Sequence, residues 1–161
     1  MAGRCTKIKK GEGKMEKIYE ILRIKQEIIE VNETDNLQVV RSPQDVVKVI
    51  EKRIADEDRE VFLVLCLNTK NKVVAIHRAH VGSINASIVH PREVFKSAIL
   101  NNAASIIVAH NHPSGQSVPS PEDFEVTKRL VKAGEIIGIE MLDHIVIGRN
   151  EYTSLKSQGH M

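Results

Sequence analysis

The chain has 161 residues, of which 42% are hydrophobic and 27% are charged, the size and balance of one globular domain. This composition excludes an intrinsically disordered chain, a collagen-like fibre and a membrane-spanning protein. The aromatic residues are three Phe and two Tyr, with no Trp, so the core must rest on aliphatic side chains. A surface that stacks nucleic-acid bases on aromatic rings is therefore disfavoured.

The formal net charge is +2, and it is unevenly distributed along the chain. Residues 1–17 carry six Lys or Arg against two Glu, an excess of +4, which leaves −2 for the rest. A slightly acidic body offers duplex DNA no electrostatic attraction. The short basic arm is either a solvated tail or a weak contact for phosphate, and the solvated tail is the more common case.

Cysteine usage and hydropathy both indicate a cytoplasmic protein. Cys5 and Cys66 are the only cysteines, one in the polar arm and one in an apolar run, so no disulfide framework is expected. No apolar stretch is long enough for a membrane helix, and the N-terminus lacks the pattern of a signal peptide. We therefore expect a reduced, cytoplasmic protein with no membrane partner.

The first 40 residues are expected to form a basic arm and an N-terminal helix, apart from a main domain over residues 41–159. Residues 1–14 are polar and have no sustained period, so we expect them to be loose. From Met15 the apolar residues recur at helical spacing, which predicts an amphipathic helix to about Glu30.

The main domain is expected to open with a helix and a hairpin. The Ser-Pro pair at residues 42–43 is typical of an N-cap and a first helical residue, and it predicts a helix through Ile54. The apolar runs 61–67 and 73–77 are separated by a turn and predict two hairpin strands. A further short extended stretch is expected within residues 79–89.

The second half of the domain interleaves helices with strands. Pro91 begins a predicted helix with one apolar face, and the apolar run 105–109 predicts a central strand. After a loop rich in Pro, Ser120 and Asp123 have the spacing of an N-cap and a first-turn acid. A final strand is expected within residues 137–147. Because helices and strands do not alternate strictly and a hairpin is included, the predicted fold class is α+β, or mixed α/β.

Two histidines and an aspartate form the pattern that points to chemistry. His110 and His112, at i and i+2 at the end of a strand, project to one side, so their imidazoles can converge. The tight loop can return Asp123 to the same strand end. Two imidazoles and a carboxylate are three ligands for a divalent ion such as zinc, with a fourth position left for water. The alternatives are that Asp123 only favours a helix N-terminus and that Ser120 is only its cap.

The segment His110-Asn111-His112-Pro113, followed by Ser120 and Asp123, resembles the metal-binding motif of the JAMM (MPN, JAB-type) zinc metallopeptidases. More narrowly, the chain is similar to the bacterial RadC family, which was historically named for DNA repair. The matching segments are 42–46, 59–62, 90–94, 110–123 and 142–154. The resemblance implies a JAMM/MPN-like domain over residues 41–159, with a central β-sheet flanked by helices in a cytidine-deaminase-like architecture.

The resemblance also implies roles for individual residues, with Zn²⁺ held by the three ligands described above. Composition alone leaves Glu51, Glu57 and Glu60 as candidates for a catalytic acid. Glu60 occupies the place of the family's glutamate, which hydrogen-bonds the zinc-bound water and takes its proton. Ser120 matches the family's serine, which donates a hydrogen bond to the developing oxyanion. His144 either orients a metal ligand or is a satisfied core histidine.

We therefore expect a zinc-dependent hydrolase, a metallopeptidase or isopeptidase in which metal-activated water attacks an amide carbonyl of a peptide or protein substrate. A second hypothesis is a nucleic-acid-binding factor of DNA repair or recombination, implied only by the family's historical name. Residues 1–40 show no match to the helix-hairpin-helix region that longer members carry upstream. The intact set of site residues disfavours a third hypothesis, a scaffold without turnover. The sequence specifies neither the substrate nor the oligomeric state.

Overall fold

The computed structural model describes residues 26, 39–84 and 89–161. The loose arm predicted for residues 1–14 lies outside the described residues, and so does the predicted N-terminal helix apart from Gln26.

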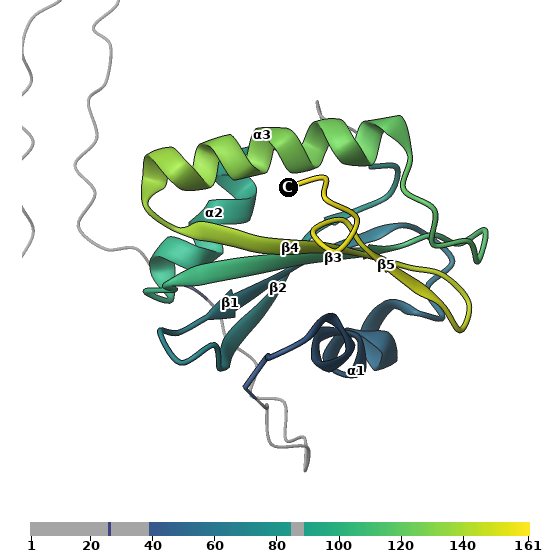
Figure 1. Cartoon of the computed structure of the whole chain (residues 1–161), viewed down its shortest axis with the longest axis horizontal. Coiled ribbons are helices and arrows are strands. Elements are labelled where there is room, and N and C mark those ends of the chain that lie inside the picture. Colours follow the sequence, from purple (N-terminus) through teal and green to yellow (C-terminus); the bar gives the residue numbers. More distant parts are fainter. Residues whose placement is uncertain (1–25, 27–38, 85–88) are drawn as a thin grey trace, which may run out of the picture. The chain divides into compact units, whose positions relative to one another are not determined.

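The described domain is a five-stranded sheet with helices on both faces (Figure 1). The strands are β1 (Val61–Leu67), β2 (Val73–Val81), β3 (Ser105–Asn111), β4 (Glu140–Ile147) and β5 (Tyr152–Ser154). The helices are α1 (Pro43–Ile54), α2 (Pro91–Leu100) and α3 (Pro121–Ile137). Helices α2 and α3 lie on one face of the sheet, and α1 lies on the other. The mixed α/β class and the central sheet flanked by helices are confirmed.

The strand order is β2-β1-β3-β4-β5. Strand β1 pairs antiparallel with both β2 and β3, β3 pairs parallel with β4, and β4 pairs antiparallel with β5. All residues of β1 and β3 are buried, as their uninterrupted apolar runs indicate, whereas the edge strand β2 is mostly exposed or half-buried. The parallel β3–β4 pair requires a crossover, which α3 supplies. The start of α3 therefore lies one loop beyond the end of β3.

The sheet separates two hydrophobic cores. Buried side chains of β1 and β3 in the core with α2 and α3 are Phe62, Val64, Cys66, Ile106 and Val108. Those in the core with α1 are Val61, Leu63, Leu65, Leu67, Ile107 and Ala109. Because successive strand residues point to opposite faces, His110 lies on the same face of β3 as Val108. The first candidate ligand is thus directed toward the face that carries α3.

Most predicted elements are confirmed, with two differences at the sheet edges. Strand β2 continues to Val81, so residues 79–81 belong to the hairpin and not to a separate stretch. A register shift between Phe62 and Leu63 lets the pairing with β1 continue. The sequence analysis missed β5, whose three residues are too few to show a strand period. None of the helices in the described ranges is long and apolar enough to cross a membrane.

Candidate metal centre

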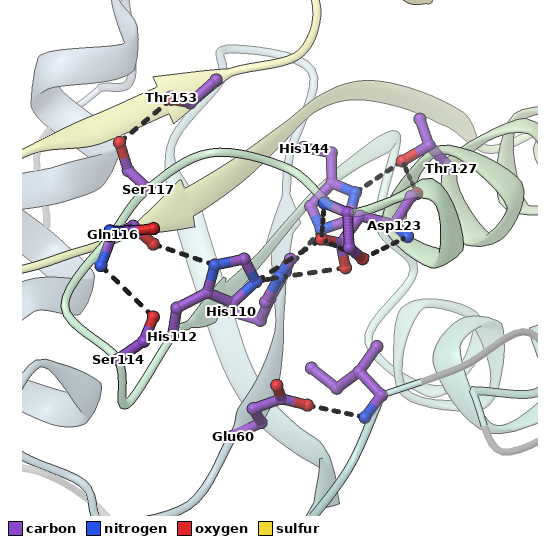
Figure 2. Close-up of polar contacts among 12 residues, drawn as sticks. Glu60, His110, His112, Ser114, Gln116, Ser117, Asp123, Thr127, His144 and Thr153 are labelled. Atoms are coloured by element: carbon purple, nitrogen blue, oxygen red, sulfur yellow. Dashed lines mark hydrogen bonds and ion pairs between the residues drawn. The ribbon is translucent and has the colours of Figure 1, made fainter.

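The end of β3 brings two imidazoles together (Figure 2). His110 is fully buried within β3, and His112 follows directly after the strand. The His112 N–H donates to Ile147 O of β4 at 2.9 Å, which continues the strand pairing by one residue. The two rings project to the same side, and their Nε2 atoms lie 3.0 Å apart. The predicted convergence of the two histidines is confirmed.

Asp123 is positioned by the start of α3. Ser120 Oγ accepts from Asp123 N at 3.2 Å, while Ser120 N and Oγ donate to Asp123 Oδ2 at 2.7 and 2.8 Å. This capping box leaves Oδ1 3.1 Å from His110 Nε2, and Oδ2 lies 3.4 Å from His112 Nε2. The Asp123 side chain is only 2% exposed. Its carboxylate therefore faces the two rings and not the solvent.

The three side chains fit a divalent metal ion of the size of zinc. Zinc ligands at about 2.0–2.1 Å in tetrahedral geometry stand about 3.4 Å apart, close to the three separations of 3.0, 3.1 and 3.4 Å observed here. Two imidazoles and a carboxylate also form a donor set typical of catalytic zinc sites. Within the described ranges, His110, His112 and Asp123 form the group of potential metal-binding side chains whose ligand atoms all lie within 4.8 Å.

The electrostatics of this cluster favour a cation. Burial alone would raise the pKa of Asp123, but hydrogen bonds from His110 and His112 and the charge of His110 hold that pKa well below its usual range. The hydrogen bond to Asp123 in turn raises the pKa of His112, against the effect of burial. Asp123 is therefore ionised at neutral pH, and its charge attracts either a proton onto His112 or a metal ion.

The loop between β3 and α3 orients the His112 ring. His112 Nδ1 lies 2.9 Å from Gln116 O, and because a carbonyl only accepts, Nδ1 carries the hydrogen and Nε2 is left for a metal. The loop is tied to the turn after β4, where Arg149 N donates to Gly115 O at 2.7 Å. A Cβ at Gly148 would lie 2.5 Å from Gly115 O. Any larger residue at position 148 would therefore displace the loop that orients His112.

Buried side chains contact the part of the His110 ring that faces away from Asp123 and His112. His110 Nδ1 lies 2.9 Å from His144 Nε2 on β4, and His144 Nδ1 lies 2.6 Å from Thr127 Oγ1 on α3. The Phe62 ring stacks on His110 at a centroid distance of 6.2 Å and meets His144 edge-on. Burial lowers the pKa of His144 well below its usual value, so this ring is neutral.

Glu60 lies just before β1 and apart from the three candidate ligands in Figure 2. Its Oε2 accepts from Ile84 N at 2.7 Å, and its carbonyl accepts from Gly82 N at 2.8 Å. The charge of Glu60 contributes to the raised pKa of His112. The carboxylate is therefore near enough to act electrostatically on the candidate centre, while a hydrogen bond from the chain segment after β2 orients it.

Asn111, between the two histidines, holds the segment that carries Glu60. Its side chain points to the opposite face of β3 from the imidazoles. Asn111 Oδ1 accepts from Val61 N at 2.7 Å, and Nδ2 donates to Arg59 O at 3.0 Å. The residues on both sides of Glu60 are thus tied to the same strand that carries the two imidazoles.

The structure brings the three predicted ligands together, and it places Ser120 against one of them. Ser120 and Asp123 also form the helix cap that the alternative interpretation gave as their only role, and the same Asp123 carboxylate faces the two imidazoles. His144, left open between two roles, contacts His110 directly. The sequence analysis missed Thr127, although its position four residues after Asp123 places it on the same helix face. It also missed Asn111, for which no sequence signal was available.

Comparisons with known proteins agree with this fold. A family model described as "RadC-like JAB domain" matches residues 40–160. A UPF0758 protein of Desulforamulus reducens is 56% identical over 121 residues, which cover 75% of this chain and 53% of the relative. A UPF0758 protein of Listeria monocytogenes is 49% identical over 150 residues, which cover 93% of this chain and 66% of the relative. The chain thus spans about half to two thirds of the length of these curated relatives. It belongs to the RadC family of JAB-domain proteins.

Proposed function

We propose that this chain is a zinc-dependent hydrolase, a metallopeptidase or isopeptidase that cleaves an amide bond in a peptide or protein. One observation carries the proposal. The Nε2 atoms of His110 and His112 lie 3.0 Å apart, and each lies 3.1–3.4 Å from one of the two carboxylate oxygens of Asp123. Three protein ligands leave a fourth position, the feature that separates catalytic zinc sites from closed structural ones. Membership of the JAB-domain family supports the same reaction class.

Zinc held by His110, His112 and Asp123 would supply Lewis acidity, which lowers the pKa of water and polarises a carbonyl. Glu60 provides the base. Its carboxylate, held by Ile84 N–H, takes the proton of the attacking water and returns it to the leaving amine. Burial of His110 and Asp123 excludes bulk water from the back of the site and strengthens these charge interactions.

Ser120 is assigned to the oxyanion. Its hydroxyl donates to Asp123 Oδ2 in the structure, and the same oxygen also receives the Ser120 N–H at 2.7 Å. The hydroxyl hydrogen can therefore turn to a substrate oxygen while the N–H continues to hold the carboxylate. A donor in this position stabilises negative charge as it develops on the carbonyl oxygen.

The test combines metal analysis with a peptide-library cleavage screen. The purified chain should hold about one equivalent of zinc and should cleave a subset of peptides, with activity abolished by a chelator and restored by Zn²⁺. The Glu60→Gln variant should retain zinc and lose activity by about 10²- to 10⁴-fold. The Glu51→Gln variant, the same change on the exposed side of α1, is the matched control. A Glu60→Gln protein as active as the control, or a wild-type chain without zinc, would overturn the proposal.

The DNA-binding alternative stays a prediction of the sequence. It is implied only by the family's historical name. The basic arm, which could contact phosphate weakly, falls outside the described residues, and no observation within the described ranges favours DNA binding. Retention on DNA that weakens steeply with salt is the measurement that would support it, because phosphate contacts release counterions.

A further inference from the structure

A chain of hydrogen bonds runs behind the candidate metal centre and ends on the helix that carries Asp123. It passes from His110 Nδ1 to His144 Nε2 at 2.9 Å and from His144 Nδ1 to Thr127 Oγ1 at 2.6 Å. Thr127 Oγ1 then donates to Asp123 O at 2.7 Å. Figure 2 shows Thr127 between His144 and Asp123, and the chain of hydrogen bonds has a candidate ligand at each end. All four residues are at most 2% exposed, so these groups are shielded from bulk water.

The last bond sets the direction of all the others. The carbonyl of Asp123 can only accept, so the single hydroxyl hydrogen of Thr127 points to it. Thr127 Oγ1 must then accept from His144, which places the His144 hydrogen on Nδ1. A neutral imidazole has only one N–H, so His144 Nε2 is an acceptor. Its partner, His110 Nδ1, must carry a hydrogen, and His110 Nε2 is the nitrogen that remains for a metal ion.

His112 also carries its hydrogen on Nδ1, and a single hydrogen bond is enough to fix it there. Its Nδ1 faces a backbone carbonyl, Gln116 O, which permits only donation. The partner of His110 is another imidazole, which could equally donate or accept. His110 therefore needs a further group to fix its tautomer, and His112 does not.

We propose that Thr127 and His144 are positioning residues that fix the hydrogen of His110 on Nδ1 and so make Nε2 its metal-binding atom. This inference rests on the proposed metal site. Neither residue is one of the three candidate metal ligands. Outer hydrogen-bond partners of metal-ligating histidines set the tautomer and ring orientation, and their loss typically costs about 10- to 100-fold in metal affinity.

The test uses the Thr127→Val variant, which keeps the shape of the side chain and removes the hydroxyl. Zinc affinity, measured by competition with a chromophoric chelator, should fall by about 10- to 100-fold. The Thr127→Ser variant restores a hydroxyl and should recover most of this loss. Equal zinc affinity in wild type and Thr127→Val, or failure of Thr127→Ser to recover an affinity lost in Thr127→Val, would overturn the inference.

A spectroscopic measurement on the wild-type chain tests the hydrogen-bond relay, from Asp123 O through Thr127 and His144 to His110, without any variant. Nitrogen-15 NMR of the imidazole rings should show the hydrogen of His144 on Nδ1, and a hydrogen on His110 Nδ1, both with and without Zn²⁺. In Thr127→Val the His144 and His110 signals should change, while His112, held by a carbonyl, serves as the internal control. A hydrogen on His144 Nε2 in the wild type would overturn the relay even if the variant failed to fold.

The two proposals can fail separately. A wild-type chain that takes up no zinc would refute the proposed function, while the ring hydrogens would still decide the relay. A chain that binds zinc but carries the His144 hydrogen on Nε2 would retain the proposed function and lose the relay.

Discussion

Helices α1 and α3 begin with the same sequence pattern, and only the start of α3 contributes to a candidate site. The pattern is Ser-Pro-Gln-Asp from Ser42 in α1 and Ser-Pro-Glu-Asp from Ser120 in α3. In each, the serine N–H donates to the aspartate Oδ2, at 3.1 Å in α1 and 2.7 Å in α3. The serine hydroxyl donates to the same oxygen at 3.0 and 2.8 Å. Both helix starts are complete capping boxes.

The two aspartates differ in what their other oxygen meets. Asp45 Oδ1 lies 3.9 Å from Lys48 Nζ, and its side chain is 23% exposed. Asp123 Oδ1 lies 3.1 Å from His110 Nε2, and its side chain is 2% exposed. The cap uses Oδ2 in both helices and leaves Oδ1 for whatever the fold brings beside it. A capping box can therefore hold a metal ligand in place, and the tertiary structure decides whether it does.

The largest expected difference between the two aspartates is the loss of zinc affinity when each is replaced by asparagine. Asp123→Asn keeps an oxygen for the cap and removes the negative charge from the candidate centre. Zinc affinity should fall by about 100-fold or more, because losing a ligand charge should cost at least as much as losing a hydrogen-bond partner of a ligand. Asp45→Asn makes the same chemical change at a partly exposed cap, where solvent and salt screen the charge, and should leave zinc affinity within about twofold. Competition with a chelator measures the zinc affinity of both variants. Similar losses of zinc affinity in the two variants would contradict the comparison.

Zinc should also stabilise the fold through one of these helix starts only. At a free zinc concentration of about 100 times Kd, the wild-type free energy of unfolding should rise by about 2.7 kcal/mol. Asp45→Asn should show the same gain, and Asp123→Asn should show little gain at that concentration. Urea unfolding with and without Zn²⁺ is the measurement. A full gain in Asp123→Asn would place the zinc elsewhere in the chain.

Alanine at the capping serines should cost similar stability and different zinc affinity. Ser42→Ala and Ser120→Ala should each lower the free energy of unfolding of the metal-free protein by about 0.5–2 kcal/mol. The loss should be larger for Ser120, because its hydroxyl also bonds a buried carboxylate. Only Ser120→Ala should weaken zinc binding, by up to about tenfold, because only there does the cap orient a ligand. Unchanged zinc affinity in Ser120→Ala would show that the cap is dispensable for the site.

The two helix starts also show which parts of the fold local sequence can predict. The Ser-Pro pairs and their first-turn acids predicted where α1 and α3 begin, and the apolar run 61–67 predicted β1 as the structure has it. These signals are local because caps and strand periods involve residues close along the chain. The three-residue β5 and the extra length of β2 depend on pairing with a neighbouring strand. No local pattern encodes that pairing.

In the candidate site, too, some features follow from local sequence and others depend on tertiary structure. The spacing of His110 and His112 predicted their convergence, and Asp123 followed from the cap pattern. The bond between His110 and His144 depends on the parallel register of β3 and β4, in which Val108 lies opposite His144. That register cannot be read from either strand alone. Glu60 required the family resemblance, because three glutamates near β1 are equivalent by composition.

The smallest expected effect is the pH dependence of stability in the metal-free protein. On acidification, the stability cost of the asparagine substitution should shrink at Asp45 and grow at Asp123. Hydrogen bonds from Arg41 N and Ser42 lower the pKa of Asp45 below its ordinary 3.8. The stabilisation from this carboxylate is therefore present above about pH 4 and is lost as the pH falls through the lowered value. The stability cost of Asp45→Asn should be constant from about pH 8 to pH 5 and should shrink below about pH 4.

The cost of Asp123→Asn should instead grow on mild acidification. Asp123 raises the pKa of His112 above its ordinary 6.5, so the pair's stabilisation is complete below about pH 6.5 and is lost as the pH rises through the raised value. Urea unfolding of both variants and the wild type, with a chelator present, should therefore show the Asp123→Asn cost rising between about pH 8 and pH 6. A cost that stays level over that range would mean that no proton replaces the metal beside Asp123. The candidate centre would then lack the exchange between proton and cation that distinguishes it from the partly exposed cap of α1.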